Sequence, residues 1–212
     1  MKRSSQERQR GASIVEMVIV VAMMMVLSAI AIMSTTNTSQ NSTASAATDL
    51  LVGTLRQARE TAIGKRRNVL VAFTGTNTIT TTVQTLPGEA PIAPTVVQLN
   101  SGAAGGLSFY LYPGLPNTPM AALGFGNNSA TDFEPVNGGA VGNSVMYTSS
   151  GSLVGSGAAA AANYYALGNN NPVNATIYIA IAGKPVTARA ITVLGATGQV
   201  RPYYWNGTSW QE

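Results

Sequence analysis

A short basic leader followed by a long apolar segment constrains this chain more than any other feature of its sequence. Residues 17–33 carry no charge and, with residues 12–15 ahead of them, are long enough as a helix to cross a bilayer. Residues 1–11 hold four basic residues and one acid, so we expect the leader to stay cytoplasmic. Glu16 interrupts the apolar character, and a charge there costs about 2.5–3.5 kcal/mol. We therefore expect Glu16 to have a partner.

The spacing from Gly11 to Glu16 resembles the class III signal of type IV prepilins and type II secretion pseudopilins. The resemblance implies that a prepilin peptidase cuts between Gly11 and Ala12 and methylates the new N-terminus at Ala12. It also implies that Glu16 pairs with the N-terminal amine of a neighbouring subunit during assembly. The commonest first mature residue in the family is phenylalanine. The alanine found here bears on methylation and packing more than on cleavage.

Two simpler interpretations compete with the prepilin signal. One is an ordinary secretory signal peptide, with Ala29-Ile30-Ala31 as its small-residue cleavage site. The other is a plain membrane anchor in which Glu16 is incidental. Both leave the spacing between Gly11 and Glu16 unexplained, so the prepilin interpretation is favoured.

The composition argues against catalysis and against binding through bulk charge. The formal net charge is +4, but the leader holds four of the twelve basic residues and one of the eight acids. Eight basic and seven acidic residues follow from Ala12 onward, so the mature chain is nearly neutral. The chain has no cysteine and no histidine, which removes disulfides, thiol nucleophiles, imidazole bases and the usual zinc ligands. We expect no catalytic residue, no metal site and no cofactor, and therefore not an enzyme.

A helical pattern follows the apolar segment. Residues 34–47 are small and polar and by themselves predict a linker, whereas the prepilin resemblance implies that the N-terminal helix continues through them. Leu51, Leu55, Ala58 and Ala62 then recur with helical spacing. Gly64 is the expected stop of this helix. The basic turn at residues 65–67 would complement the negative end of its dipole.

Strand patterns dominate the remainder of the chain. They cover residues 69–73, 78–83, 96–99, 107–111, 144–148, 176–181, 188–194, 199–205 and 208–210. Residues 113–143 are rich in Gly, Pro and Asn and predict irregular structure, while 155–172 is a low-complexity insert that fits a short helix or a loop. Asn206-Gly207 predicts a two-residue hairpin turn. The pattern indicates an α+β fold in which a long N-terminal helix packs on antiparallel sheet structure.

Later motifs resemble the GspH/FimT-type pseudopilins more narrowly. These are the helix segment 55–62, the stretch 147–153, and the pair 189–193 and 197–201. With the signal, the resemblance spans residues 11–201 and implies a pilin-like organisation in four parts. Residues 1–11 form the leader, 12–33 the transmembrane and filament-core helix, 34–64 its periplasmic continuation, and 65–212 a β-rich globular domain.

The resemblance implies a structural role as a minor pilin or pseudopilin of a type II secretion or type IV pilus machine. Its partners would be the prepilin peptidase, other pilin or pseudopilin subunits and the bacterial inner membrane. The chain would cross that membrane once, with its C-terminal domain in the periplasm, before entering a pilus or pseudopilus.

The alternative is a DNA-binding minor pilin that serves DNA uptake. The candidate residues are Arg201, Arg189, Lys184, Lys65, Arg66 and Arg67. Arg201 stands where DNA-binding relatives carry the second of two arginines, but Gln199 replaces the first. The aromatic residues 203–205 could stack on bases or sugars, or could equally pack within the hairpin. Few phosphate contacts are available, which weakens this alternative.

Overall fold

One continuous helix opens the structure. The computed structural model describes residues 14–86, 88–99, 106–135, 142–155 and 172–212. Helix α1 runs from Ile14 to Lys65 and includes the polar stretch 34–47, so the linker interpretation is wrong and the continued helix is correct. Directly after this stretch, the Thr48 hydroxyl donates back along the helix to the Ala44 carbonyl at 2.8 Å. The chain forms two compact units, residues 1–39 and 40–212.

The apolar part of α1 forms the described portion of the first unit. Residues 14–31 have a mean hydropathy of 2.6, and by length and composition this segment can cross a membrane. None of its side chains is buried within the chain. The apolar surface is thus available to lipid or to other helices.

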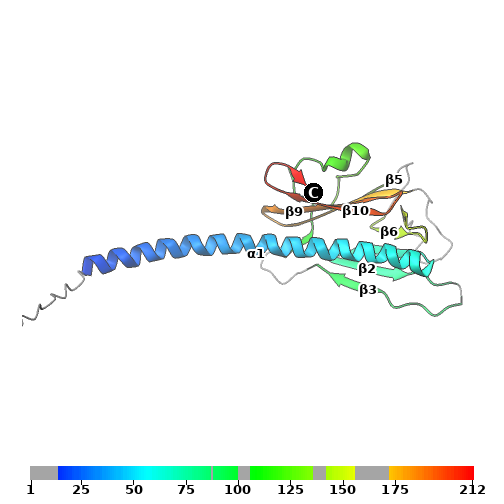
Figure 1. Cartoon of the computed structure of the whole chain (residues 1–212), viewed down its shortest axis with the longest axis horizontal. Helices are drawn as coiled ribbons and strands as arrows, with labels where there is room; N and C mark the ends of the chain where they lie inside the picture. The colour runs from blue at the N-terminus through cyan, green and yellow to red at the C-terminus, as the bar shows by residue number, and fades with distance from the viewer. Residues whose placement is uncertain (1–13, 87, 100–105, 136–141, 156–171) are drawn as a thin grey trace, which may run out of the picture. The chain divides into compact units, whose positions relative to one another are not determined.

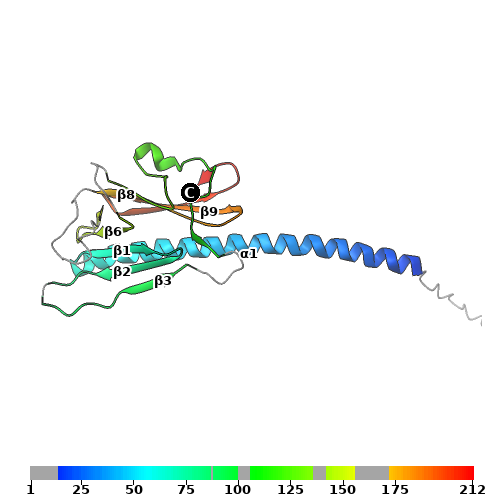
Figure 2. The same cartoon turned by 180° about the vertical axis from the view of Figure 1, so that it is seen from behind.

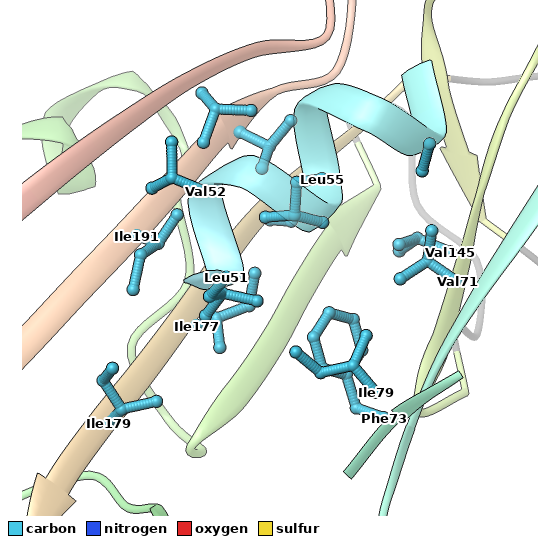
Figure 3. Close-up of a cluster of buried hydrophobic side chains, with 14 of the residues drawn as sticks. Leu51, Val52, Leu55, Val71, Phe73, Ile79, Val145, Ile177, Ile179 and Ile191 are labelled. Carbon is cyan, nitrogen blue, oxygen red and sulfur yellow. The ribbon is translucent and has the colours of Figure 1, made fainter. Parts of the chain in front are cut away.

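The second half of α1 belongs to the same compact unit as the sheets (Figure 1). Its expected apolar face is confirmed, since Leu51, Leu55, Ala58 and Ala62 are all buried. Figure 3 shows how the helix and both sheets contribute to one core: Leu51, Val52 and Leu55 from α1, Val71, Phe73, Ile79 and Val145 from one sheet, and Ile177, Ile179 and Ile191 from the other. The α+β prediction is therefore confirmed.

Helix α1 ends one residue later than expected, and the left-handed position is Arg66. Its φ is 52°, whereas Gly64 stays helical. The amide of Arg66 donates to the Ile63 carbonyl at 3.2 Å, and the amide of Arg67 donates to the Ala62 carbonyl at 3.0 Å. These two bonds form the Schellman arrangement that commonly closes helices. Bonding of the last carbonyls therefore determines the helix end, and glycine is not required for it.

Two antiparallel sheets follow the helix. The first has the order β3-β2-β1-β6-β7, and the second has β11-β10-β9-β8-β4, with β5 also paired to β8. The strands of the first sheet are β1 (Val69–Thr74), β2 (Thr78–Val83), β3 (Thr95–Gln98), β6 (Ser144–Tyr147) and β7 (Leu153–Gly155). Those of the second are β4 (Ser108–Phe109), β5 (Thr131–Pro135), β8 (Val173–Ile181), β9 (Lys184–Leu194), β10 (Gln199–Trp205) and β11 (Trp210–Gln211).

Most strand predictions are confirmed, and three expectations are wrong. The region 113–143, which was expected to be irregular, contains strand β5 and a 3-10 helix, η1 (Pro119–Leu123). Strand β5 forms because β8 provides backbone hydrogen-bond partners, and the local sequence pattern does not predict this pairing. The strand expected at 107–111 shortens to β4. The last hairpin closes at Trp205 and Trp210, so its loop is residues 206–209, four residues instead of two. The insert 155–172 lies almost wholly outside the described residues.

The second sheet also carries apolar side chains on the face away from α1. We call this set the outer cluster: Tyr178, Ala180, Ala188, Ala190, Tyr203, Trp205 and Trp210. Partly buried residues of the segment 110–120 pack against it. The indole of Trp210 donates to the Pro116 carbonyl at 2.7 Å and joins that segment to the sheet. Both faces of the second sheet are therefore covered.

Tyr147 gives a direct test of the main core. Its side chain is fully buried, and its hydroxyl has no hydrogen-bond partner within the part of the chain that the structure describes. We expect Tyr147→Phe to raise the free energy of unfolding by about 1 kcal/mol, because it removes a polar group that is desolvated without compensation. Chemical unfolding followed by circular dichroism measures the change, and Tyr204→Phe, at an exposed site, should leave stability unchanged.

The same variant should alter the response to alkaline pH. Burial raises the pKa of the Tyr147 hydroxyl well above its usual value near 10, an effect that the Arg59 charge partly opposes. The folded chain therefore keeps a proton that the unfolded chain releases, so stability falls as pH rises above about 10. Tyr147→Phe should lose less stability over that range than the parent chain. An equal alkaline loss in both proteins would contradict this assignment.

Candidate functional site

The described part of the predicted signal is the start of α1. Gly11 and Ala12 lie outside the described residues, so cleavage and methylation there stay predictions. Glu16 lies in the first turn of α1, and its side chain is exposed. An acid in the first turn interacts favourably with the helix dipole. Its apolar neighbours in the sequence are exposed as well. The carboxylate is therefore accessible to a partner outside the chain.

The basic turn after α1 is already partly engaged. Arg67 forms an ion pair with Glu89, including a hydrogen bond of 2.8 Å from Nη2 to Oε1. Hydrogen bonding from Arg67, with a smaller contribution from the backbone amide of Leu86, lowers the pKa of the Glu89 carboxyl. Lys65 and Arg66 are exposed. The turn thus closes the helix, and its Arg67 also holds the loop after β2.

Arg201 lies on β10, opposite Thr192 of β9. It therefore shares the outer face of the second sheet with Tyr203. Its Nη1 lies 3.8 Å from Oε2 of Glu212, and its side chain is 40% exposed. Of the three aromatic residues beside it, Tyr203 and Trp205 pack in the outer cluster, and Tyr204 is exposed. Hairpin packing accounts for two of the three aromatics.

Arg189 is buried and donates to backbone carbonyls. Its Nη1 bonds to the carbonyls of Val186 and Ala188, each at 3.0 Å, and its side chain is 8% exposed. Lys184 begins β9 at the β8–β9 hairpin. Both views place that hairpin and the end of α1 at opposite ends of the sheets (Figures 1 and 2). The structure therefore does not gather the six candidate basic residues on one surface.

The segments that carry the narrower resemblance lie close together in the structure, and their common contact is Arg59. Its Nε donates to the Gly151 carbonyl and to the Thr197 carbonyl, each at 3.1 Å. These carbonyls belong to the β6–β7 loop and the β9–β10 loop. Gly198 (φ 68°) permits the approach, since a Cβ there would lie 2.3 Å from the Gly151 oxygen. One helix side chain thus connects the loops of both sheets.

The sequence predicted no role for Arg59, although all three segments carry the narrower resemblance. The available signals were two glycines in polar turns and an arginine beside the apolar helix face. They do not show that two loops far apart in sequence present carbonyl oxygens to the same guanidinium. Only the packing of α1 against both sheets brings them together.

We expect Arg59→Met to lower the free energy of unfolding by about 2 kcal/mol, because two carbonyls lose a charged donor. The side chain is partly exposed, so water replaces some of the loss. Arg56→Met is the matched control, since Arg56 is exposed on the same helix and should change stability by less than about 0.5 kcal/mol. Equal effects of the two substitutions on denaturant unfolding would contradict the role given to Arg59.

The described residues contain no group of three or more acidic side chains placed to hold a metal ion. Asp132, which could be drawn with Glu134 as a carboxylate pair, is buried and accepts a hydrogen bond from the Asn128 amide. That bond closes a turn in the loop before β5. Asp132 therefore has a structural role within the chain.

Comparison with known proteins identifies two similar crystal structures. Both are of the type IV minor pilin FimU of Pseudomonas aeruginosa, in two crystal forms, at 13% sequence identity and a TM-score of 0.37. Each match covers 79% of this chain and 97% or 92% of the FimU chain. No protein-family model matches the sequence, and no curated protein matches it.

Proposed function

We propose that this chain is a structural subunit of a type IV pilin-like filament, a minor pilin or pseudopilin. The observation that carries the proposal is the spacing from Gly11 to Glu16, with Glu16 in the first turn of a 52-residue helix. The first part of that helix exposes its apolar side chains, and the second part is built into a β-rich unit. This division suits a subunit that is anchored by one end and folded at the other.

In this proposal the apolar part of α1 has two successive environments. It crosses the inner membrane first, with the leader in the cytoplasm and the β-rich unit in the periplasm. It then packs against the helices of neighbouring subunits in the filament core. Met23, Met24 and Met25 suit such a core, because unbranched thioether side chains fill irregular gaps.

Glu16 has a specific role in the transfer from membrane to filament. Its carboxylate pairs with the methylated amine of Ala12 on a neighbouring subunit, once the prepilin peptidase has removed residues 1–11. An ion pair within an apolar core offsets the cost of keeping the charge there. The type II secretion pseudopilus and the type IV pilus both use such subunits, and the proposal covers either machine.

The structural role is preferred over DNA binding for reasons of residue placement. Arg67 and Arg201 are engaged in ion pairs, and Arg189 donates to backbone carbonyls. Phosphate contacts dominate the affinity of DNA-binding proteins, so these engagements reduce what is available. Titration with duplex DNA at low salt should therefore show little binding, and binding that is lost in Arg201→Ala would favour the alternative.

The test of the proposal is the intact mass of the membrane-extracted protein. We expect the loss of residues 1–11 and the addition of one methyl group, which places the mature N-terminus at Ala12. Expression in a strain without prepilin peptidase is the control and should return the full precursor mass. A mature N-terminus at Ile32 would replace the proposal with ordinary signal-peptide cleavage.

A further inference from the structure

A cavity of about 360 Å³ lies between the second half of α1 and the second sheet. Its walls are Ser45, Thr48 and Asp49 from α1, Arg189 from β9, and Pro202, Tyr203 and Tyr204 from β10, with Glu212 beside them. The volume is within the range typical of small-molecule sites. The walls combine an apolar surface with hydroxyl groups and charges of both signs.

Arg189 is the buried charge of this cavity. Its guanidinium reaches α1, where Nη2 lies 3.4 Å from the Ser45 hydroxyl oxygen. Nη1 is occupied by two backbone carbonyls, whereas Nε has no acceptor among the described residues. The ion pairs of the described chain join Arg67 to Glu89 and Arg201 to Glu212. Arg189 therefore has no carboxylate partner among the residues that the structure describes.

A buried cation without a counter-ion is costly. Moving a charge out of water is unfavourable unless an opposite charge or a full set of hydrogen bonds compensates for it. Burial lowers the pKa of the Arg189 guanidinium, and the nearby Tyr204 opposes this effect. A bound carboxylate would supply the missing negative charge. It would also accept hydrogen bonds from the unused N–H groups in the bidentate geometry that arginine favours.

The second charge of the cavity is on the same helix face. Asp49 follows Ser45 by four residues, so its side chain lies about 5–6 Å further along α1 on the same side. Asp49 is exposed, while Arg189 is buried. A simple anion would be attracted by Arg189 and repelled by Asp49. A ligand with a carboxylate at one end and an ammonium at the other would satisfy both.

We propose that this cavity binds a zwitterionic ω-amino acid, with its carboxylate on Arg189 and its ammonium towards Asp49. Ser45, which the Arg189 guanidinium reaches, and Asp49 lie one helical turn apart on α1, about 5.4 Å, and an extended chain of four or five carbons matches this spacing. The apolar surface of Pro202 and Tyr204 would contact the methylene groups. This site is separate from the N-terminal assembly residues and does not depend on filament formation.

The test uses the full chain in non-ionic detergent micelles and 5-aminovalerate as the probe. Titration followed by ¹H–¹⁵N correlation spectra should give saturable shifts of the Tyr204 amide and of the Arg189 Nε–H signal. Arg189→Gln should abolish the saturable shifts. Asp49→Asn should weaken binding roughly fivefold, as expected for removing one opposite charge near a surface. Arg56→Gln changes an exposed side chain outside the cavity, and this variant should bind as the parent does.

Valerate is the matched ligand control, because it lacks only the ammonium. Binding of valerate as tightly as 5-aminovalerate would overturn the proposal, and so would the absence of saturable shifts with either ligand. Arg189 is buried, so Arg189→Gln must be checked for folding by circular dichroism. If that variant does not fold, Asp49→Asn decides: unchanged affinity for 5-aminovalerate overturns the proposal, and weakened affinity supports it.

Discussion

Glu16→Ala is expected to abolish entry into filaments while leaving processing and membrane insertion intact. Removal of the charge lowers the cost of inserting the apolar segment by about 2.5–3.5 kcal/mol, so insertion should become easier. The same change removes the carboxylate that we propose pairs with the amine of a neighbouring Ala12. A subunit with this substitution should therefore accumulate in the membrane and be missing from sheared filaments. Quantitative immunoblotting of the two fractions measures the partition.

Two further substitutions make the result specific to the buried charge. Glu60→Ala removes an exposed acid from the same helix, far from the apolar segment, and should enter filaments normally. Glu16→Gln keeps the size and hydrogen-bonding capacity of the side chain without its charge, and should fail as the alanine variant does. Normal incorporation of Glu16→Ala would show that the residue is incidental and would favour a plain membrane anchor.

Gly11→Leu should leave the precursor uncut. In the proposed signal the peptidase requires the glycine at the cleavage position, so a bulky side chain there blocks processing. The uncut leader keeps residues 1–11 on the chain, and no free amine forms at Ala12. The variant should therefore run at the precursor mass and be absent from filaments, even though Glu16 is intact.

Ala12→Phe is the matched control for that substitution. It introduces phenylalanine, the commonest first mature residue of the prepilins that the signal resembles, directly after the proposed cut. Since cleavage depends chiefly on the glycine, this variant should be processed to completion. Intact mass reports its methylation, and its recovery in sheared filaments reports its packing. Efficient cleavage of Gly11→Leu at the Gly11 position would contradict the proposed signal.

Together, Glu16→Ala and Gly11→Leu distinguish a defect in filament assembly from a defect in precursor processing. A defect in both variants with normal processing of Glu16→Ala supports the complete pathway from precursor to filament. Arg59→Met tests a different property, because it weakens the connection between α1 and the two sheets without touching the signal. A folded but unassembled Glu16→Ala subunit and a less stable Arg59→Met subunit should therefore be distinguishable by their unfolding curves.

Local sequence determined the elements whose pattern is strong over a short range. Alternation and β-branching in 69–83 predicted both strands of the first hairpin and their pairing. The helical spacing of Leu51, Leu55, Ala58 and Ala62 predicted the face that is buried. Both patterns depend on which side chains recur at a fixed interval, and this information is complete within the sequence itself.

Backbone hydrogen bonding in the folded chain decided what side-chain patterns could not predict. The polar stretch 34–47 has poor helix propensity, but it lies between two strongly helical segments and continues them. Strand β5 forms in a segment rich in Gly and Asn because its backbone pairs with β8. Arg66 takes a left-handed conformation because the last helix carbonyls need partners. In each case the backbone hydrogen bonds outweigh the local preference of the residues.

The candidate sites divide in the same way. The proposed signal from Gly11 to Glu16 is a linear pattern, so the sequence alone was enough to predict it. The Arg59 contacts join residues 92 and 138 positions apart. The cavity at Arg189 combines α1 with strands β9 and β10. Burial and hydrogen-bond partners of a charged side chain depend on which distant segments pack around it, and only the tertiary structure determines them.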